Sequence, residues 1–171
     1  ESGIHLHYLG TAFLALLVGY PRALLSMAAI ALLGPLIAPH TLGADSALPA
    51  LDPFRAWGLR VVVGGVIPIW SMWLLVQACK RWLPRNLFVF LLGCGLFGLV
   101  LCYGLQVLTS AALIALLQPE TGVALAESVM PYALLLASGE AWLEGMVVTV
   151  LVVYVPGAVR LFDEGFYLRR A

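Results

Sequence analysis

The chain contains little charge. Only 11% of its 171 residues are Asp, Glu, Lys or Arg, whereas a soluble domain typically carries about 25%. Its formal net charge is zero, so nothing in the composition indicates a nucleic-acid partner. Cysteine is also scarce, and Cys79, Cys94 and Cys102 have no C-x-x-C spacing. We therefore expect all three to behave as small apolar residues.

Enzyme motifs are missing as well. The sequence contains no H-E-x-x-H, no G-x-S-x-G and no Walker lysine motif, so we predict that the chain is not an enzyme. Residues 93–98 do match the G-x-G-x-x-G dinucleotide fingerprint. That fingerprint requires a strand before it and a soluble βαβ unit around it, but here it lies inside an apolar run. Its small residues instead predict close packing between membrane helices.

Apolar residues dominate what is present. They make up 63% of the chain, and the mean hydropathy is +1.02. Because the apolar runs far exceed the ~10-residue alternating strands of a barrel, the sequence predicts an all-α polytopic membrane protein, one domain over residues 1–171. Apolar windows give about five membrane passes, at roughly 8–20, 23–38, 56–78, 87–117 and 125–155.

Proline and glycine predict where these passes bend or end. We expect Pro21-Arg22 to end the first pass and Pro68 to kink the third. The last run is too long for one straight pass, and a break is expected near Pro131 or Ser138-Gly139.

Basic residues predict the orientation. They fall at Arg22, in residues 80–85 and in residues 160–170, alternating with loops that carry acidic residues. The positive-inside rule then places the C-terminus in the cytoplasm and the N-terminal segment outside. Residues 159–170 alternate apolar and charged side chains, a pattern that fits docking of a partner or lying along lipid headgroups.

Two imidazoles, His5 and His7, stand just before the first apolar run. Imidazole is the commonest side-chain ligand for late first-row metals, so both are candidate metal ligands. Being two residues apart, they can face one ion only in an extended segment, not on a helix. The alternative makes His5 an interfacial polar residue and His7 a hydrogen-bonding residue at a helix start.

Glu140 and Glu144 lie in the last apolar run and share one helix face. A bare carboxylate in apolar surroundings is costly and is usually neutralised or paired. One interpretation pairs either glutamate with Arg60, linking two helices. The other places both on a path for cations or protons.

A family resemblance begins at His7-Tyr8-Leu9-Gly10-Thr11. This stretch resembles the Ser-His-Pro-Thr-Gly-Thr motif of the membrane permeases of cobalt and nickel energy-coupling-factor transporters, the CbiM/NikM type, whose His is a metal ligand. Further short similarities follow in the same order as in the family, at residues 19–21, 58–60, 65–68 and 143–149. The ending is similar to a proteobacterial branch of these permeases.

The resemblance implies a seven-helix bundle in the bacterial inner membrane, of which this sequence would be the last five helices, with upstream residues missing. It implies that Ni²⁺ or Co²⁺ is the substrate, with His7 as a ligand. The implied partners are a transmembrane coupling subunit and cytosolic ATPases.

Two departures from the family pattern favour an alternative. The family's Met-His start, which supplies its other ligands, is not in this sequence, and Arg60 replaces an Asn near the site. A fixed positive charge about 6 Å from a dication would cost roughly 5 kcal/mol at an effective dielectric constant of ~20. The alternative is a non-transporting accessory subunit that scaffolds a larger respiratory or photosynthetic membrane complex.

Overall fold

The computed structural model describes residues 10–37, 57–59, 61–117 and 122–167. Within these ranges the chain is almost entirely helical and contains no strand. The elements in order are α1 (Thr11–Val18), α2 (Tyr20–Ile37), the π-helical stretch η2 (Val62–Val66) leading into α4 (Ile67–Trp82), the π-helical stretch η3 (Val89–Phe97) leading into α5 (Gly98–Leu117), α6 (Gly122–Tyr154), the short 3-10 helix η4 (Pro156–Ala158) and α7 (Glu164–Tyr167).

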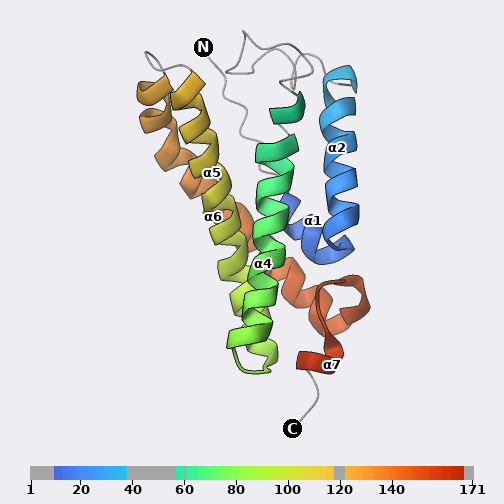
Figure 1. Ribbon diagram of the computed structural model, residues 1–171. Coiled ribbons are helices and arrows are strands. Elements are labelled where there is room, and N and C mark those ends of the chain that lie inside the picture. The colour runs from blue at the N-terminus through green and yellow to red at the C-terminus, as the bar shows by residue number, and fades with distance from the viewer. Residues whose placement is uncertain (1–9, 38–56, 60, 118–121, 168–171) are drawn as a thin grey trace.

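The long helices form an antiparallel bundle (Figure 1). α5 packs most extensively against α6, and α4 packs against both α5 and α1. The loop between α4 and η3 and the short helix α7 lie at one end, here called the α7 end, and the turn between α1 and α2 lies between this end and the middle of the bundle (Figure 1). At the opposite end, α2 and α5 finish and α6 begins.

Three helical segments are long and apolar enough to cross a membrane: Trp57–Trp82, Val89–Leu116 and Met130–Tyr154. With 26, 28 and 25 residues, each exceeds the ~20 residues that a bilayer core of about 30 Å requires. α2 contributes a shorter apolar helix, Tyr20–Leu33. α1 has eight residues and reaches only about 12 Å, in line with the expectation that the first apolar run is short for a full crossing.

The outer surface of the bundle is apolar. Only 28–29% of each membrane-length window is buried inside the molecule, and large apolar side chains such as Phe97, Leu135 and Trp142 are 60–73% exposed. A soluble monomer rarely exposes continuous apolar surface on this scale. This surface suits lipid, and it agrees with the predicted class of all-α membrane protein.

Two predicted boundaries are wrong. The break after α1 falls at Gly19, whose φ is +84°, whereas Pro21 lies inside the first turn of α2, where its missing N–H is not needed. α6 runs unbroken through Pro131 and Gly139. A proline near the start of such a long helix removes one backbone hydrogen bond without ending the helix. The third pass, where we expected a kink at Pro68, contains the π-helical stretch η2 just before that proline.

The small residues at 93–98 pack helices together, as predicted. A Cβ on Gly98 would lie 2.6 Å from Leu75 Cδ2 on α4. From the facing helix α6, a Cβ on Gly145 would lie 2.6 Å from the carbonyl oxygen of Gly95. These contacts leave no room for side chains at the glycines. The match to the G-x-G-x-x-G pattern therefore reflects close packing between helices.

The described part of the predicted tail folds back onto the bundle. The backbone N–H groups of Arg160 and Leu161 donate to the carbonyl oxygens of Leu17 and Leu16, at 3.1 Å each. These carbonyls belong to the last turn of α1 and have no partner within that helix. The segment after α6 therefore caps the carboxyl end of α1.

Aromatic packing holds the same segment in place. The rings of Phe162 and Tyr167 lie 5.0 and 5.3 Å from the ring of Phe90. Burial raises the pKa of the Tyr167 hydroxyl, so Tyr167 stays neutral at physiological pH. Nearby, Lys80 Nζ lies 3.3 Å from Asp163 Oδ2. This ion pair links the end of α4 to the turn before α7.

Candidate interior polar site

The predicted site residues divide into two groups. His5, His7 and Arg60 lie outside the described residues, so the ligand roles of the histidines and the pairing of Arg60 with a glutamate stay predictions. Glu140 and Glu144 lie on α6, and both are half-buried. Of the predicted site residues, these two glutamates on α6 are the ones whose surroundings the structure describes.

Glu144 is hydrogen-bonded to a tyrosine on α5. The Tyr103 hydroxyl donates to Glu144 Oε2 at 2.5 Å, and the Tyr103 side chain is completely buried. This bond links the two helices that pack most closely. Sequence reasoning did not single out Tyr103, although the signal was present: Tyr103 and Gln106 carry polar atoms one turn apart in an otherwise apolar helix.

The amino end of α1 lies against this pair. Gly10, with φ of +63°, begins the helix, and a Cβ on Gly10 would lie 3.4 Å from Glu144 Oε1. The carboxyl group of Glu144 thus faces the partial positive charge of a helix start.

The contact lies deep in the bundle. Tyr103 is 14 residues from Val89 (103 − 89) and 13 from Leu116 (116 − 103), the ends of its membrane-length segment. Glu144 is 14 residues from Met130 (144 − 130) and 10 from Tyr154 (154 − 144). α1 therefore begins about halfway along the bundle and runs from there toward the α7 end (Figure 1).

Two more polar side chains, Gln106 and Glu140, lie one helical turn away. Because α5 and α6 run antiparallel, Gln106 and Glu140 both lie about one turn from the Tyr103–Glu144 pair, toward the end opposite α7. Gln106 is only 6% exposed. Its Nε2 lies 3.9 Å from the position of a Cβ on Gly64 in η2, so the side chain reaches toward that stretch.

Two buried oxygens in this region lack a hydrogen-bond partner among the residues that the structure describes: Gln106 Oε1 and Thr11 Oγ1. Thr11 is 3% exposed and is the first residue of α1. We call Thr11, Tyr103, Gln106, Glu140 and Glu144 the interior polar cluster.

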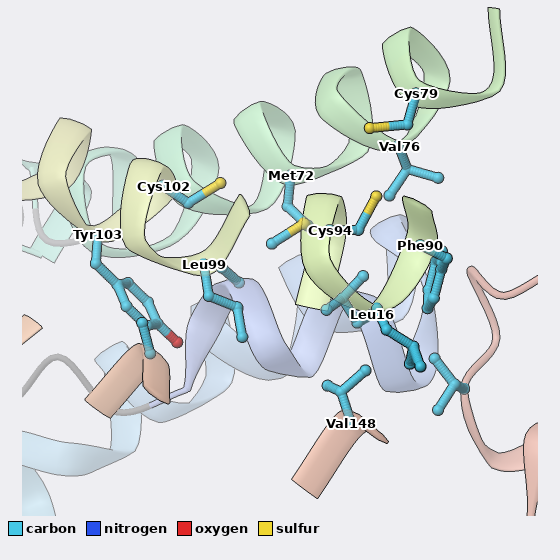
Figure 2. Close-up of a cluster of buried hydrophobic side chains, with 14 of the residues drawn as sticks. Leu16, Met72, Val76, Cys79, Phe90, Cys94, Leu99, Cys102, Tyr103 and Val148 are labelled. Atoms are coloured by element: carbon cyan, nitrogen blue, oxygen red, sulfur yellow. The ribbon is translucent and has the colours of Figure 1, made fainter. Parts of the chain in front are cut away.

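Apolar side chains close the cluster toward the α7 end. From Tyr103, a row of buried residues continues through Leu99 and Leu16 to Phe90 (Figure 2), and all of them are fully buried. Val148, one turn beyond Glu144 on α6, is fully buried as well. A ligand at the cluster would therefore enter from the opposite end.

Positive charge in the described ranges is confined to the half of the bundle that ends at α7. It comes from five residues in the first turn of α2, the end of α4, the loop after α4 and the tail: Arg22, Lys80, Arg81, Arg85 and Arg160. Carboxylates in an apolar interior favour a positive charge beside them. The side chains that the structure describes contain no group of three His, Cys, Asp or Glu residues able to hold a metal ion, so a metal at the cluster would need further donors.

A separate hollow of about 250 Å³ lies on the outer surface between η3 and α6. Apolar residues, among them Leu92, Trp142 and Met146, form most of its lining. Its shape would fit an acyl chain, but its lining contains few polar groups. The interior polar cluster is therefore the candidate site. No protein-family model, curated protein or solved structure matches the chain.

Proposed function

We propose that this chain is the membrane-embedded substrate-binding subunit of an energy-coupling-factor transporter for a divalent metal, cobalt or nickel. The observation that carries the proposal is the start of α1 in the middle of the bundle, against the Tyr103–Glu144 pair. Helices that begin near the membrane midplane are a common way for transporters to build ion sites. An ionisable pair at that depth has a functional role by default.

The sequence adds a nitrogen donor close by. His7 precedes Gly10 by three residues, and three residues of chain span at most about 11 Å. The chain therefore allows the His7 imidazole to reach Glu144. Together they would combine a neutral imidazole with a carboxylate, a pairing that borderline divalent metals accept.

The direction of transport follows from charge and packing. All five basic residues that the structure describes lie in the half of the bundle that ends at α7, so the positive-inside rule favours a cytoplasmic α7 end in a bacterial cell. The apolar row from Leu99 to Phe90 separates the cluster from that side. Metal would enter from outside, and its release inward would require a rearrangement driven by the coupling subunit and ATPases.

A second candidate is the accessory subunit that scaffolds a larger membrane complex. It is favoured by the absence, within the described ranges, of any group of three metal-binding side chains. In that case the Tyr103–Glu144 bond would serve only to link α5 and α6, and the exposed apolar faces would contact neighbouring subunits.

Calorimetry on the purified protein with its natural N-terminus distinguishes the two. The transporter proposal predicts that Ni²⁺ or Co²⁺ binds and that His7→Ala and Glu144→Gln abolish binding. His40→Ala, which changes the third histidine of the sequence, should leave binding unchanged because His40 lies in a predicted loop. The scaffold candidate predicts that neither metal binds and that the chain co-purifies in fixed proportion with a larger complex. Tight binding that survives His7→Ala would count against the proposed site.

A further inference from the structure

The two unpartnered oxygens of the interior polar cluster are the starting point. Gln106 Oε1 and Thr11 Oγ1 are buried without a hydrogen-bond partner in the described ranges, on side chains that are 6% and 3% exposed. Polar atoms in protein interiors are usually satisfied, and an apolar bundle gives them no bulk water. Two such atoms in one cluster indicate a partner that is not part of the described chain.

Other hydroxyls in the same helices behave differently. Thr109, Ser110 and Thr149 each donate to a carbonyl oxygen of their own helix, at 2.8–3.0 Å. This is the usual way for a hydroxyl to be satisfied inside a membrane helix. Thr11 is the first residue of α1 and has no preceding helical turn to supply such a carbonyl, so its hydroxyl remains available.

Both oxygens belong to residues that neighbour the groups in contact with Glu144. Thr11 follows Gly10, whose Cβ position is 3.4 Å from Glu144 Oε1. Gln106 lies one turn beyond Tyr103, the residue that donates to Glu144 Oε2. The groups come from α1, α5 and α6, and the apolar row toward the α7 end leaves the opposite end as their approach.

We propose that Gln106 and Thr11 supply side-chain oxygens to a cation site whose carboxylate is Glu144. This inference rests on the proposed function and specifies the donor atoms: oxygen atoms hold most of the coordination positions of the cation. Carbonyl, hydroxyl and carboxylate oxygens suit Mn²⁺, Co²⁺ and Ni²⁺, whereas Cu⁺ prefers sulfur. The sulfur atoms of Cys94 and Cys102 point toward α4, which carries Met72, whereas the Tyr103 ring points away from α4 (Figure 2).

The test replaces each oxygen by an apolar group of similar size and uses CoCl₂ as the probe. Gln106→Leu and Thr11→Val should raise the Kd for Co²⁺ at least tenfold, because even second-shell partners of a metal contribute 10- to 100-fold. Without metal, both variants should be at least as thermally stable as the parent, since each loses an unsatisfied buried polar atom. A residue that lowers stability but is needed for binding belongs to a functional site.

Three further variants make the outcome specific. Gln77→Leu changes an exposed glutamine, and Thr149→Val changes a hydroxyl already bonded to its own helix; both should keep the parent Kd. Gln106→Glu retains an oxygen and should retain binding, which separates lost ligation from lost folding.

Two results would overturn the inference. If Gln106→Leu and Thr11→Val bind Co²⁺ like the parent while His7→Ala does not, the oxygens are not ligands, although the proposed function stands. If both variants instead lose thermal stability with an unchanged Kd, the oxygens hold a structural water. Absence of Co²⁺ binding in the parent protein would overturn the proposed function itself.

Discussion

Removing the hydroxyl of Tyr103 is the most informative single perturbation of the bundle. That hydroxyl donates to Glu144 Oε2, so it joins α5 to α6 beside the start of α1. Tyr103→Phe keeps the ring, which is fully buried, and removes only this hydrogen bond. The variant therefore measures the polar contact without creating a large cavity.

The magnitude follows from what is left unsatisfied. A buried group that loses its partner costs about 1–3 kcal/mol, and the half-buried Glu144 carboxyl loses its partner here. We therefore expect the free energy of unfolding to fall by about 2 kcal/mol. For a chain of this size, that corresponds to a decrease in Tm of about 4–8 °C.

The assay is thermal unfolding in detergent micelles, followed by circular dichroism. Tyr132→Phe is the matched control, because Tyr132 lies on α6 and is 73% exposed. Its Tm should change by less than about 2 °C, as expected for a surface substitution. Equal Tm values for the two variants would refute the role assigned to the Tyr103 hydroxyl.

Three further predictions concern packing, surface charge and pH. Gly145→Ala places a Cβ 2.6 Å from a backbone oxygen, so it should lower the free energy of unfolding by about 1–3 kcal/mol in a denaturation experiment. Gly139→Ala is the control: nothing lies within 4 Å of its Cβ position, so the stability should not fall. Asp163→Asn breaks the exposed ion pair with Lys80 and should cost at most about 1 kcal/mol, an effect that vanishes in high salt; a larger loss would contradict the surface assignment. Calorimetric affinity for Ni²⁺ should fall as pH decreases below about 6.5, because His7 must be neutral to bind metal, and a pH-independent affinity would argue against an imidazole ligand.

Much of the fold could be predicted because composition determines it. The apolar runs gave the helical class and the approximate limits of the three long segments, since lipid permits few other structures. The break after the first helix was misplaced because Pro21 is a stronger signal in sequence than Gly19, although proline is tolerated in a first turn. The predicted break in α6 was wrong for a related reason: proline weakens a long helix locally without ending it.

The candidate site was only half visible in the sequence. Glu140 and Glu144 stand out because carboxylates are rare in apolar runs. Tyr103, Gln106 and Thr11 were missed because their polar atoms are common in membrane helices and usually bond to their own backbone. Their shared location depends on how α1, α5 and α6 pack, and no local pattern encodes that contact.

The central claim, that the amino end of α1 and Glu144 form a cation site, is tested most directly by locating the metal. Crystals of the protein grown with CoCl₂ would be measured at the cobalt absorption edge for anomalous scattering. The claim predicts a peak inside the bundle with a Glu144 carboxylate oxygen about 2.1 Å away, and no peak in Glu144→Gln. An anomalous peak only at surface carboxylates such as Asp163 or Glu164, with none beside Glu144, would contradict it.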